Sequence, residues 1–285
     1  MFKRIIMCTV VCMCAAMVAV TGCKSDSNTP KGEVELVYVE WACATAATNV
    51  MKAVLEKANY RVKITPVSAA AMWSATSSGD VEGFVCAWLP GTHGNYLKQV
   101  KGKVEDLGPN MTGAKIGLVV PKYVTINSIT ELKANKDKFN GKIIGIDPGA
   151  GIMSAAEKAI KEYGIGFKLI EGSGATMTAS LADAVKKQQW IVVTGWAPHW
   201  KFARWELKFL EDPKGVFGGA ETINTVVRVG LKKDMPEVYD ILNKFQISSE
   251  DLHTIMLWNT EDNADVYKNA KKWVEQNSSK VSQWL

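Results

Sequence analysis

Past its N-terminal region, the chain alternates between short β-branched runs and longer stretches whose apolar residues recur at helical spacing. ELVYVEW (35–41), VEGFVCAW (81–88) and WIVVTGW (190–196) have the composition of strands, whereas TAATNVMKAVLEKANY (45–60) and IMSAAEKAIKEYG (152–164) have a helical pattern. Further strands are expected at 61–67, 115–121, 142–147, 167–172 and 222–231, and further helices at 70–79, 129–139, 176–189 and over the last fifty or so residues. Such alternation predicts an α/β protein with parallel sheets and helices on both faces.

Two β-rich crossings, near residues 114–121 and 222–231, divide this pattern. The simplest arrangement is two α/β lobes joined by two hinge strands. We expect lobe 1 to contain residues 34–117 and 229–285, and lobe 2 to contain residues 118–228. Ligands of such folds bind outside the carboxyl ends of the strands and between lobes, so a ligand cleft is expected there.

The N-terminus has the pattern of a secretory signal. Lys3 and Arg4 precede the apolar run IIMCTVVCMCAAMVAV, which is too short and wrongly flanked for a membrane span. The following VTGC resembles the bacterial lipobox, in which the cysteine is lipidated and becomes the mature N-terminus. We expect a lipoprotein signal peptide at 1–22, lipidation of Cys23 and a polar tether at 23–33. The alternative is an ordinary cleaved signal.

Charge and hydropathy narrow the class of protein. Removal of Lys3 and Arg4 takes the net charge from +5 to +3, and no long basic run is present, so nucleic acid is not an expected partner. The charged fraction of 22% and the hydrophobic fraction of 47% fit one large folded domain or two ordinary ones. No long apolar segment follows the signal, which argues against a receptor fused to its permease.

Two cysteines remain after the signal and Cys23 are set aside. Cys43 and Cys86 could pair in an oxidising compartment, or could be two small buried hydrophobic residues. No Cys/His spacing suggests a metal, and no cofactor is expected.

Three tryptophans stand where predicted strands end. Trp41 closes ELVYVEW, Trp88 closes VEGFVCAW, and Trp196 ends the strand that leads into APHW. Two would come from the first lobe and one from the second, so their rings could converge on one cleft. Aromatic faces attract a cation that has no N–H to donate, so the set predicts a cage for a quaternary ammonium. The chain's other tryptophans are assigned mainly to packing.

A second feature suits an anion. In KIIGIDPGAGIMSAAEKAI a strand and a glycine-rich turn, with Gly149 and Gly151, precede a helix that starts near Ile152, whose free N–H groups favour a carboxylate. His93, five residues past Trp88, is a second candidate donor. His199 and His253 lack comparable context.

The sequence of the same turn also partly matches the glycine-rich fingerprint of dinucleotide-binding proteins. Glu171 lies twenty residues beyond Gly151, but Ser154 replaces the third glycine, and the motif sits in mid-chain. An exported protein also lacks access to cytosolic NAD, so we set this alternative aside.

Several blocks, including SGDVEGFVCAWLPGTHGNYL, GKIIGIDPGAGIMSAAEKAI and VVTGWAPHWKFARWELKFLEDPKGVFGGAETINTVVR, resemble the OpuAC-like glycine betaine-binding proteins of ABC transporters from about residue 34 to 260. The resemblance implies a two-lobed type II periplasmic-binding-protein fold. It implies a trimethylammonium cage of Trp41, Trp88 and Trp196. It also implies that a carboxylate is held by the backbone N–H groups of Gly151 and Ile152 together with His93.

Two departures from the family pattern leave the preferred ligand open. Ala42 stands where many relatives have an acidic residue, and Gly91 where some have asparagine. Neither removes a cage ring or a carboxylate-binding group.

The sequence therefore predicts an extracytoplasmic, lipid-anchored, monomeric receptor that binds glycine betaine or a related zwitterion and docks to an ABC transporter permease. A choline- or carnitine-preferring receptor is the alternative within this class. The alternative from another class is a secreted enzyme using Ser154 or Cys86 with His93, but no nucleophile and base stand at a recognised spacing.

Overall fold

The computed structural model describes residues 29–285. The predicted signal peptide at 1–22 and the lipidation site Cys23 lie outside the described residues. Within residues 29–285, no helix is both long enough and apolar enough to cross a membrane.

The first lobe is built on strands that follow the predicted alternation. β1 (Glu33–Tyr38) pairs in parallel with β2 (Arg61–Pro66) and with β3 (Gly83–Leu89). β9 (Glu221–Arg228) pairs antiparallel to β3 on the other side. β3 is buried along its whole length, as expected for a central strand covered on both faces.

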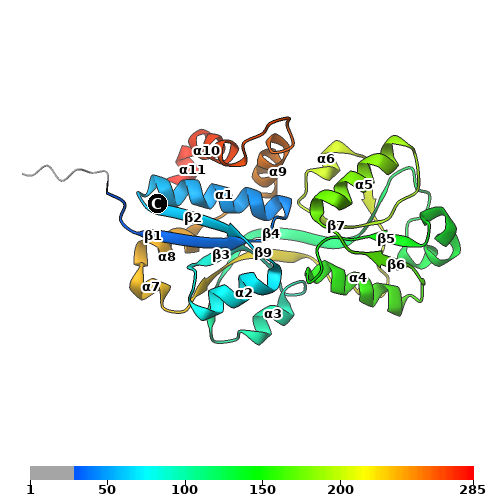
Figure 1. Ribbon diagram of the computed structural model, residues 1–285, viewed down its shortest axis with the longest axis horizontal. Helices are drawn as coiled ribbons and strands as arrows, with labels where there is room; N and C mark the ends of the chain where they lie inside the picture. The colour runs from blue at the N-terminus through cyan, green and yellow to red at the C-terminus, as the bar shows by residue number, and fades with distance from the viewer. Residues whose placement is uncertain (1–28) are drawn as a thin grey trace, which may run out of the picture.

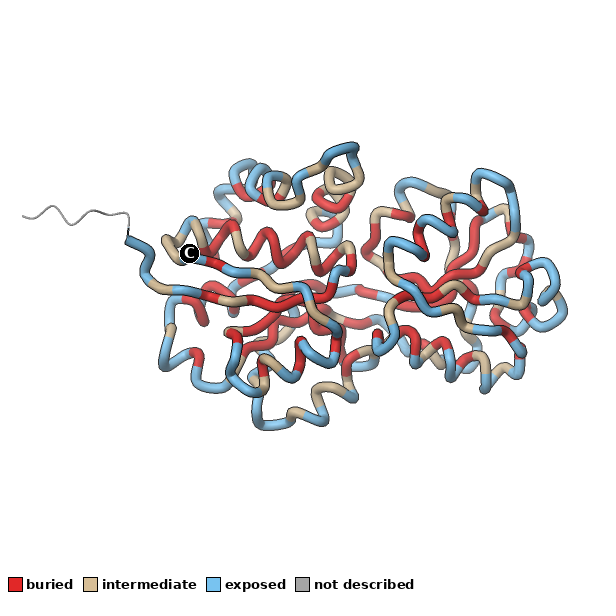
Figure 2. Tube along the Cα trace, in the orientation of Figure 1, coloured by how far each residue is buried: buried red, intermediate tan, exposed pale blue. Residues whose placement is uncertain are grey.

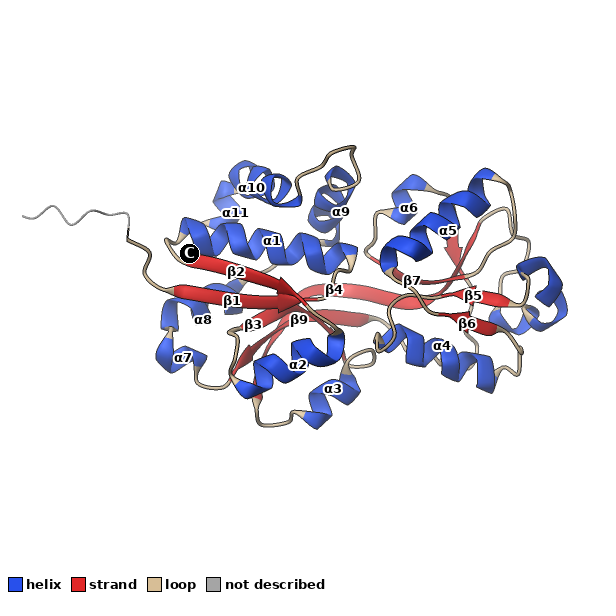
Figure 3. Ribbon diagram, in the orientation of Figure 1, coloured by secondary structure: helices blue, strands red, loops and turns tan. Residues whose placement is uncertain are grey.

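One long strand, β4 (Val104–Pro121), runs from the first lobe into the second (Figure 3). As far as Ala114 it pairs with β9, and from Lys115 onward it pairs with β7 (Val193–Ala197) and β8 (Leu207–Phe209). Two parallel strands complete the second lobe, β5 (Lys142–Ile144) beside β7 and β6 (Lys168–Ile170) at the edge.

The hydrogen bonding refines the lobe boundaries that the sequence suggests. β9 lies entirely against β3 and β4 of the first sheet, whereas the sequence assigned residues up to 228 to the second lobe. We propose that the second lobe ends before Glu221 and that β4 carries the crossing near residue 115.

Helices lie on both sides of the first sheet. α1 (Ala42–Lys57) runs along one side and α2 (Ala69–Ser78) along the other (Figure 1), and α9 (Ser249–Trp258) and α10 (Val266–Gln276) pack on the outside of α1. The remaining helices of this lobe are α3 (Gly94–Gln99), α7 (Leu231–Asp234), α8 (Pro236–Lys244) and α11 (Ser278–Val281). The predicted helical C-terminal region is thus present.

The second lobe repeats this layering with α4 (Gly151–Glu162) and α5 (Gly174–Lys186) on opposite sides of its strands, and a short helix, α6 (Lys201–Arg204). Buried residues follow the strands of both lobes and the inner side of α1 (Figure 2). Buried residues thus line the sheet in both lobes, and β4 connects the two.

The helix predicted over 129–139 is wrong in type. The structure has two 3₁₀ segments, Ile129–Glu131 and Lys133–Phe139, with non-helical backbone at Asn135. The Asn135 side chain donates to the carbonyl oxygen of Glu131, the acceptor that an α-helix would offer to the N–H of residue 135. Asparagine often competes with helical hydrogen bonding in this way.

Candidate ligand-binding site

A cavity lies between the two lobes, with about 310 Å³ of space not occupied by protein atoms, counted to its opening toward solvent. All six residues that the sequence singled out for ligand binding line this cavity: Trp41, Trp88, Trp196, His93, Gly151 and Ile152. The other lining residues, which sequence reasoning did not select, are Cys43, Thr92, Ile116, Ile146 and Ala150.

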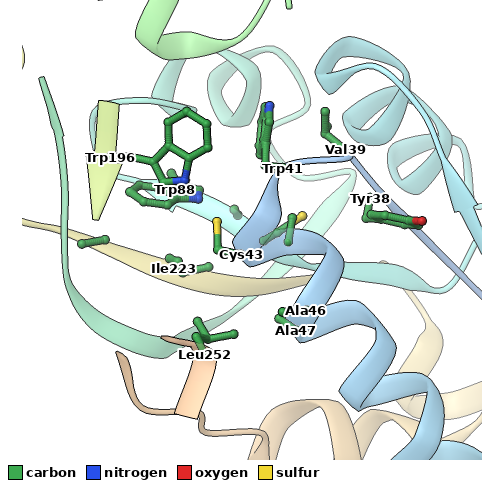
Figure 4. Packing of buried hydrophobic residues seen from close by; sticks show 14 of the residues in the cluster. Tyr38, Val39, Trp41, Cys43, Ala46, Ala47, Trp88, Trp196, Ile223 and Leu252 are labelled. Atoms are coloured by element: carbon green, nitrogen blue, oxygen red, sulfur yellow. The ribbon is translucent and has the colours of Figure 1, made fainter. Parts of the chain in front are cut away.

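The three tryptophans reach the cavity from both lobes. Trp41 is the N-cap residue of α1 just after β1, Trp88 lies at the end of β3, and Trp196 lies at the end of β7. All three are buried. Figure 4 shows their rings gathered at the N-terminal end of α1, with the Cys43 side chain beneath them. The strand ends thus bring together three indoles that are 47 and 108 residues apart in sequence order.

Two hydrogen bonds join the lobes at the edge of the cavity. The Trp41 indole N–H donates to Oδ1 of Asp147 at 3.0 Å, and the Tyr96 hydroxyl donates to the Gly149 carbonyl oxygen at 2.8 Å. The Trp41 indole offers a donor and no acceptor, so it cannot cap α1, and its N–H bonds to the opposite lobe instead. The structure is therefore a closed state in which one predicted cage ring is held from the opposite lobe. Sequence reasoning missed Asp147 and Tyr96, although Asp147 lies in the glycine-rich turn it emphasised.

His93 lines the cavity and has one ring nitrogen available as a hydrogen-bond donor. Its Nδ1 accepts the Trp88 backbone N–H at 3.0 Å, so the proton of the neutral ring is on Nε2. Nε2 is buried and has no hydrogen-bond partner among the described residues. Burial lowers the pKa of His93 to about 3, so the ring is neutral at ordinary pH. Within residues 29–285, this uncharged N–H donor is thus left without a protein acceptor.

The N-terminus of α4 supplies further donors. The helix begins at Gly151, and its N-cap residue is Ala150, which has no side-chain acceptor for the first N–H groups of the helix. Gly151 and Ile152 line the cavity. Free amides and the helix dipole at this position attract an anion, and His93 offers a third N–H.

Gly151 is required by a close approach of the two lobes. A Cβ added there would lie 2.1 Å from the carbonyl oxygen of Thr92. Thr92 is itself held by Glu221 at the start of β9, because its N–H and its hydroxyl donate to the two carboxylate oxygens, each at 2.6 Å. The Thr92 backbone is thereby fixed against α4, a contact between distant segments that the sequence does not reveal.

The structure shows where the two cysteines lie, and where the residues proposed for the enzyme alternative lie. Cys43 and Cys86 are both free and buried, so the structure contains no disulfide between them. Burial raises the pKa of the Cys86 thiol, which disfavours the nucleophilic thiolate, and Cys86 does not line the cavity. Ser154 lies on α4 in the outer part of the cleft. Residues 29–285 hold no cluster of side chains suited to a metal ion.

The buried histidines predict sensitivity of the fold to acid. Burial holds the pKa of His93 near 3 and that of His199 well below its usual value, whereas the unfolded chain takes up protons below about pH 6.5. The contribution of these two rings to stability is therefore full above about pH 6.5 and is lost as the pH falls, by up to about 1.4 kcal/mol per pH unit for each ring. Denaturant unfolding at about pH 7.5 and about pH 5 measures this loss. The loss of stability should be smaller in His93→Gln than in the wild type. An equal loss in the two proteins would contradict the assignment of the acid sensitivity to the buried His93 ring.

Two α/β lobes that close over a small cavity, each supplying groups to its lining, define a type II solute-binding protein. A family model described as the substrate binding domain of an ABC-type glycine betaine transport system matches residues 32–276, and the chain belongs to this OpuAC family. The predicted resemblance and fold are confirmed. This is a family of transport substrate-binding proteins and not of enzymes.

Individual relatives agree with the family assignment. The glycine betaine/carnitine transport binding protein GbuC of Listeria monocytogenes is 46% identical over 151 residues, which is 52% of this chain but only about half (50%) of that relative. Lactococcal OpuAC, crystallised closed with glycine betaine, is 40% identical, with a TM-score of 0.85 over 89% of this chain and 99% of its own. The glycine/betaine/L-proline-binding protein ProX from Borrelia burgdorferi is 40% identical, with a TM-score of 0.87 over 89% and 96%.

Proposed function

We propose that this protein is the receptor of an ABC importer for glycine betaine or a closely related quaternary-ammonium zwitterion. One observation carries the proposal: a single cavity is lined by three indole rings from both lobes, by the unpartnered Nε2–H of His93 and by the uncapped start of α4. The rings suit a methylated cation, and the N–H groups suit a carboxylate. A betaine carries both groups on one small molecule.

The energies are of the right order for a working receptor. Three dry aromatic rings contribute roughly 2–6 kcal/mol, and each charge-assisted hydrogen bond to a carboxylate adds about 1.5–3 kcal/mol. Ordering of ligand and lobes offsets part of this sum. The remainder suits dissociation constants near micromolar, which require about 8 kcal/mol.

Closure completes the site in this proposal. Trp196, Gly151 and Ile152 belong to one lobe, and Trp41, Trp88 and His93 belong to the other, so neither lobe alone holds both ends of a betaine. The bonds from Trp41 to Asp147 and from Tyr96 to Gly149 stabilise the closed state. Exclusion of water then strengthens the attraction of both ligand charges.

In the same proposal the protein acts as a monomer outside the cytoplasm. A lipid on Cys23 anchors it to the membrane, and the polar residues that follow Cys23 serve as a tether. The tether predicted at 23–33 is too long at its C-terminal end, because Lys31 donates its backbone N–H to the Asn59 carbonyl oxygen and Glu33 is the first residue of β1. The tether lets the folded lobes reach the membrane-embedded permease to which they deliver the ligand.

Calorimetric and thermal-shift titrations with glycine betaine, proline betaine, carnitine and choline test the function. We expect binding near micromolar for at least one carboxylate-bearing ligand and a higher melting temperature in its presence. The absence of heat and of any thermal shift with all of these ligands contradicts the proposal.

His93→Ala distinguishes a betaine receptor from a choline receptor. It should weaken glycine betaine binding at least about tenfold, because it removes a charge-assisted hydrogen bond to the carboxylate. Choline has no carboxylate, so its affinity for the same variant should change little, which makes choline an internal control for folding. Tight choline binding by the wild type, with no effect of His93→Ala on either ligand, supports the choline alternative instead.

A further inference from the structure

Among residues 29–285, one buried lysine without a counter-ion contacts a ring of the cavity. Lys201, the first residue of α6, is completely buried, and its Nζ has no hydrogen-bond partner among residues 29–285. No carboxylate within the described part of the chain makes an ion pair with it. Buried charged groups are almost always paired, so this one calls for an explanation.

The Lys201 ammonium lies against a ring that lines the cavity. Nζ is 4.2 Å from the centroid of the Trp196 ring and 5.4 Å from that of Phe202. Trp196 lines the cavity, but Lys201 does not. Lys201 thus contacts a lining ring without lining the cavity itself, and the lysine and a ligand cation would share one aromatic system.

No neighbouring titratable group compensates the charge. Cys43, from α1, faces Lys201, but burial raises the pKa of its thiol to about 11, so the thiol is uncharged at neutral pH. His199, beside α6, is neutral because burial and the Lys201 charge hold its pKa well below its usual value, and His253 of α9 acts on His199 in the same direction. Burial correspondingly lowers the pKa of Lys201 itself to about 7.

We propose that Lys201 is a positioning residue that sets ligand affinity through Trp196, weakening the cage when it carries a proton and allowing full affinity when it is neutral. The inference rests on the proposed function, since it requires a cation in the cage. Like charges on one aromatic ring oppose each other, and by linkage a bound ligand must disfavour the lysine proton as much as that proton disfavours the ligand. Binding of a betaine therefore releases a proton from Lys201.

The linkage predicts a pH profile. Affinity for glycine betaine should rise about tenfold from pH 6 to pH 8 and then level off, because the neutral lysine becomes the main form in the free protein. At pH 7 binding should release about half a proton. His93 stays neutral throughout this range, and the ligand carboxylate stays ionised, so neither group produces the same profile.

Calorimetry at pH 7 in phosphate and in Tris, buffers with very different ionisation heats, tests the inference on the intact mature protein. In the wild type the binding heat should depend on the buffer. In Lys201→Met it should not, affinity at pH 6 should rise about tenfold, and the pH profile should become flat. Lys201→Gln, which is uncharged but polar, should behave in the same way. It provides a second test if Lys201→Met fails to fold.

Lys138→Met is the matched control. Lys138 lies 4.4 Å over the ring of Trp190 in the same lobe but is exposed, and neither residue lines the cavity, so its removal should leave the buffer dependence unchanged. His253→Gln should also leave it unchanged. Binding of a betaine with the same heat in both buffers overturns the role of Lys201 alone, whereas no binding of any quaternary ammonium overturns the proposed function.

Discussion

Replacing Gly151 by alanine is expected to weaken betaine binding by at least about a hundredfold. The added methyl group would lie 2.1 Å from the Thr92 carbonyl oxygen, and Glu221 holds Thr92 in place through two hydrogen bonds. Since neither side can move freely, α4 must shift away from the first lobe. The N–H groups of Gly151 and Ile152 then leave the carboxylate, at a cost of two charge-assisted hydrogen bonds. Calorimetry with glycine betaine measures the loss.

Gly174→Ala is a suitable control for this substitution. Gly174 is the first residue of α5, as Gly151 is of α4, but a Cβ there meets nothing within 4 Å. It should leave affinity unchanged and stabilise the helix slightly. Wild-type affinity in Gly151→Ala would show that the lobes do not approach each other this closely when the ligand is bound.

Replacing Trp196 by alanine should weaken glycine betaine binding about thirtyfold or more. Trp196 is the one cage ring from the second lobe, and a dry cation–π contact with tryptophan contributes about 2 kcal/mol or more. Selectivity is the sharper readout. The variant should lose much of the preference for glycine betaine over glycine, whose ammonium relies on hydrogen bonds rather than on aromatic faces.

Trp190→Ala controls for the general loss of a tryptophan in the same lobe. Trp190 packs against Phe139 outside the cavity, so its removal should lower stability but not affinity. If Trp196→Ala and Trp190→Ala have the same small effect on betaine affinity, the cage does not contribute to binding.

The fold could be predicted because its strands and helices differ clearly in period. The buried strand β3 reads as a continuous apolar run, and a helix such as α4 presents one apolar face. Trp41, Trp88 and Trp196 were recognisable as a set because each ends such a run, and in α/β folds strand ends converge.

The first half of β4 was not predictable in the same way. Residues 104–114 include Gly108, Pro109 and Gly113 and few apolar residues, a composition typical of a loop. Residues 104–114 form a strand because β9 supplies their hydrogen-bond partners. The register shifts near Gly108, Pro109 and Gly113. Pairing with a segment more than a hundred residues away decides this structure, and local sequence does not contain it.

Contacts across the cleft were missed for the same reason. Asp147 and Tyr96 lie in segments with other evident roles, and each gains its partner only when the lobes meet. The burial of Lys201 has no signal in the local sequence, because a lysine in a loop-rich segment is usually solvated. Its burial follows from the packing of α6 against the Trp196 ring.

A crystal structure of the protein with glycine betaine tests the central claim most directly. The account predicts the trimethylammonium group among the rings of Trp41, Trp88 and Trp196, within cation–π distance of each. It also predicts the carboxylate on Nε2 of His93 and on the amides of Gly151 and Ile152. A ligand bound outside these rings, or with its carboxylate where the methyl groups should be, would contradict it.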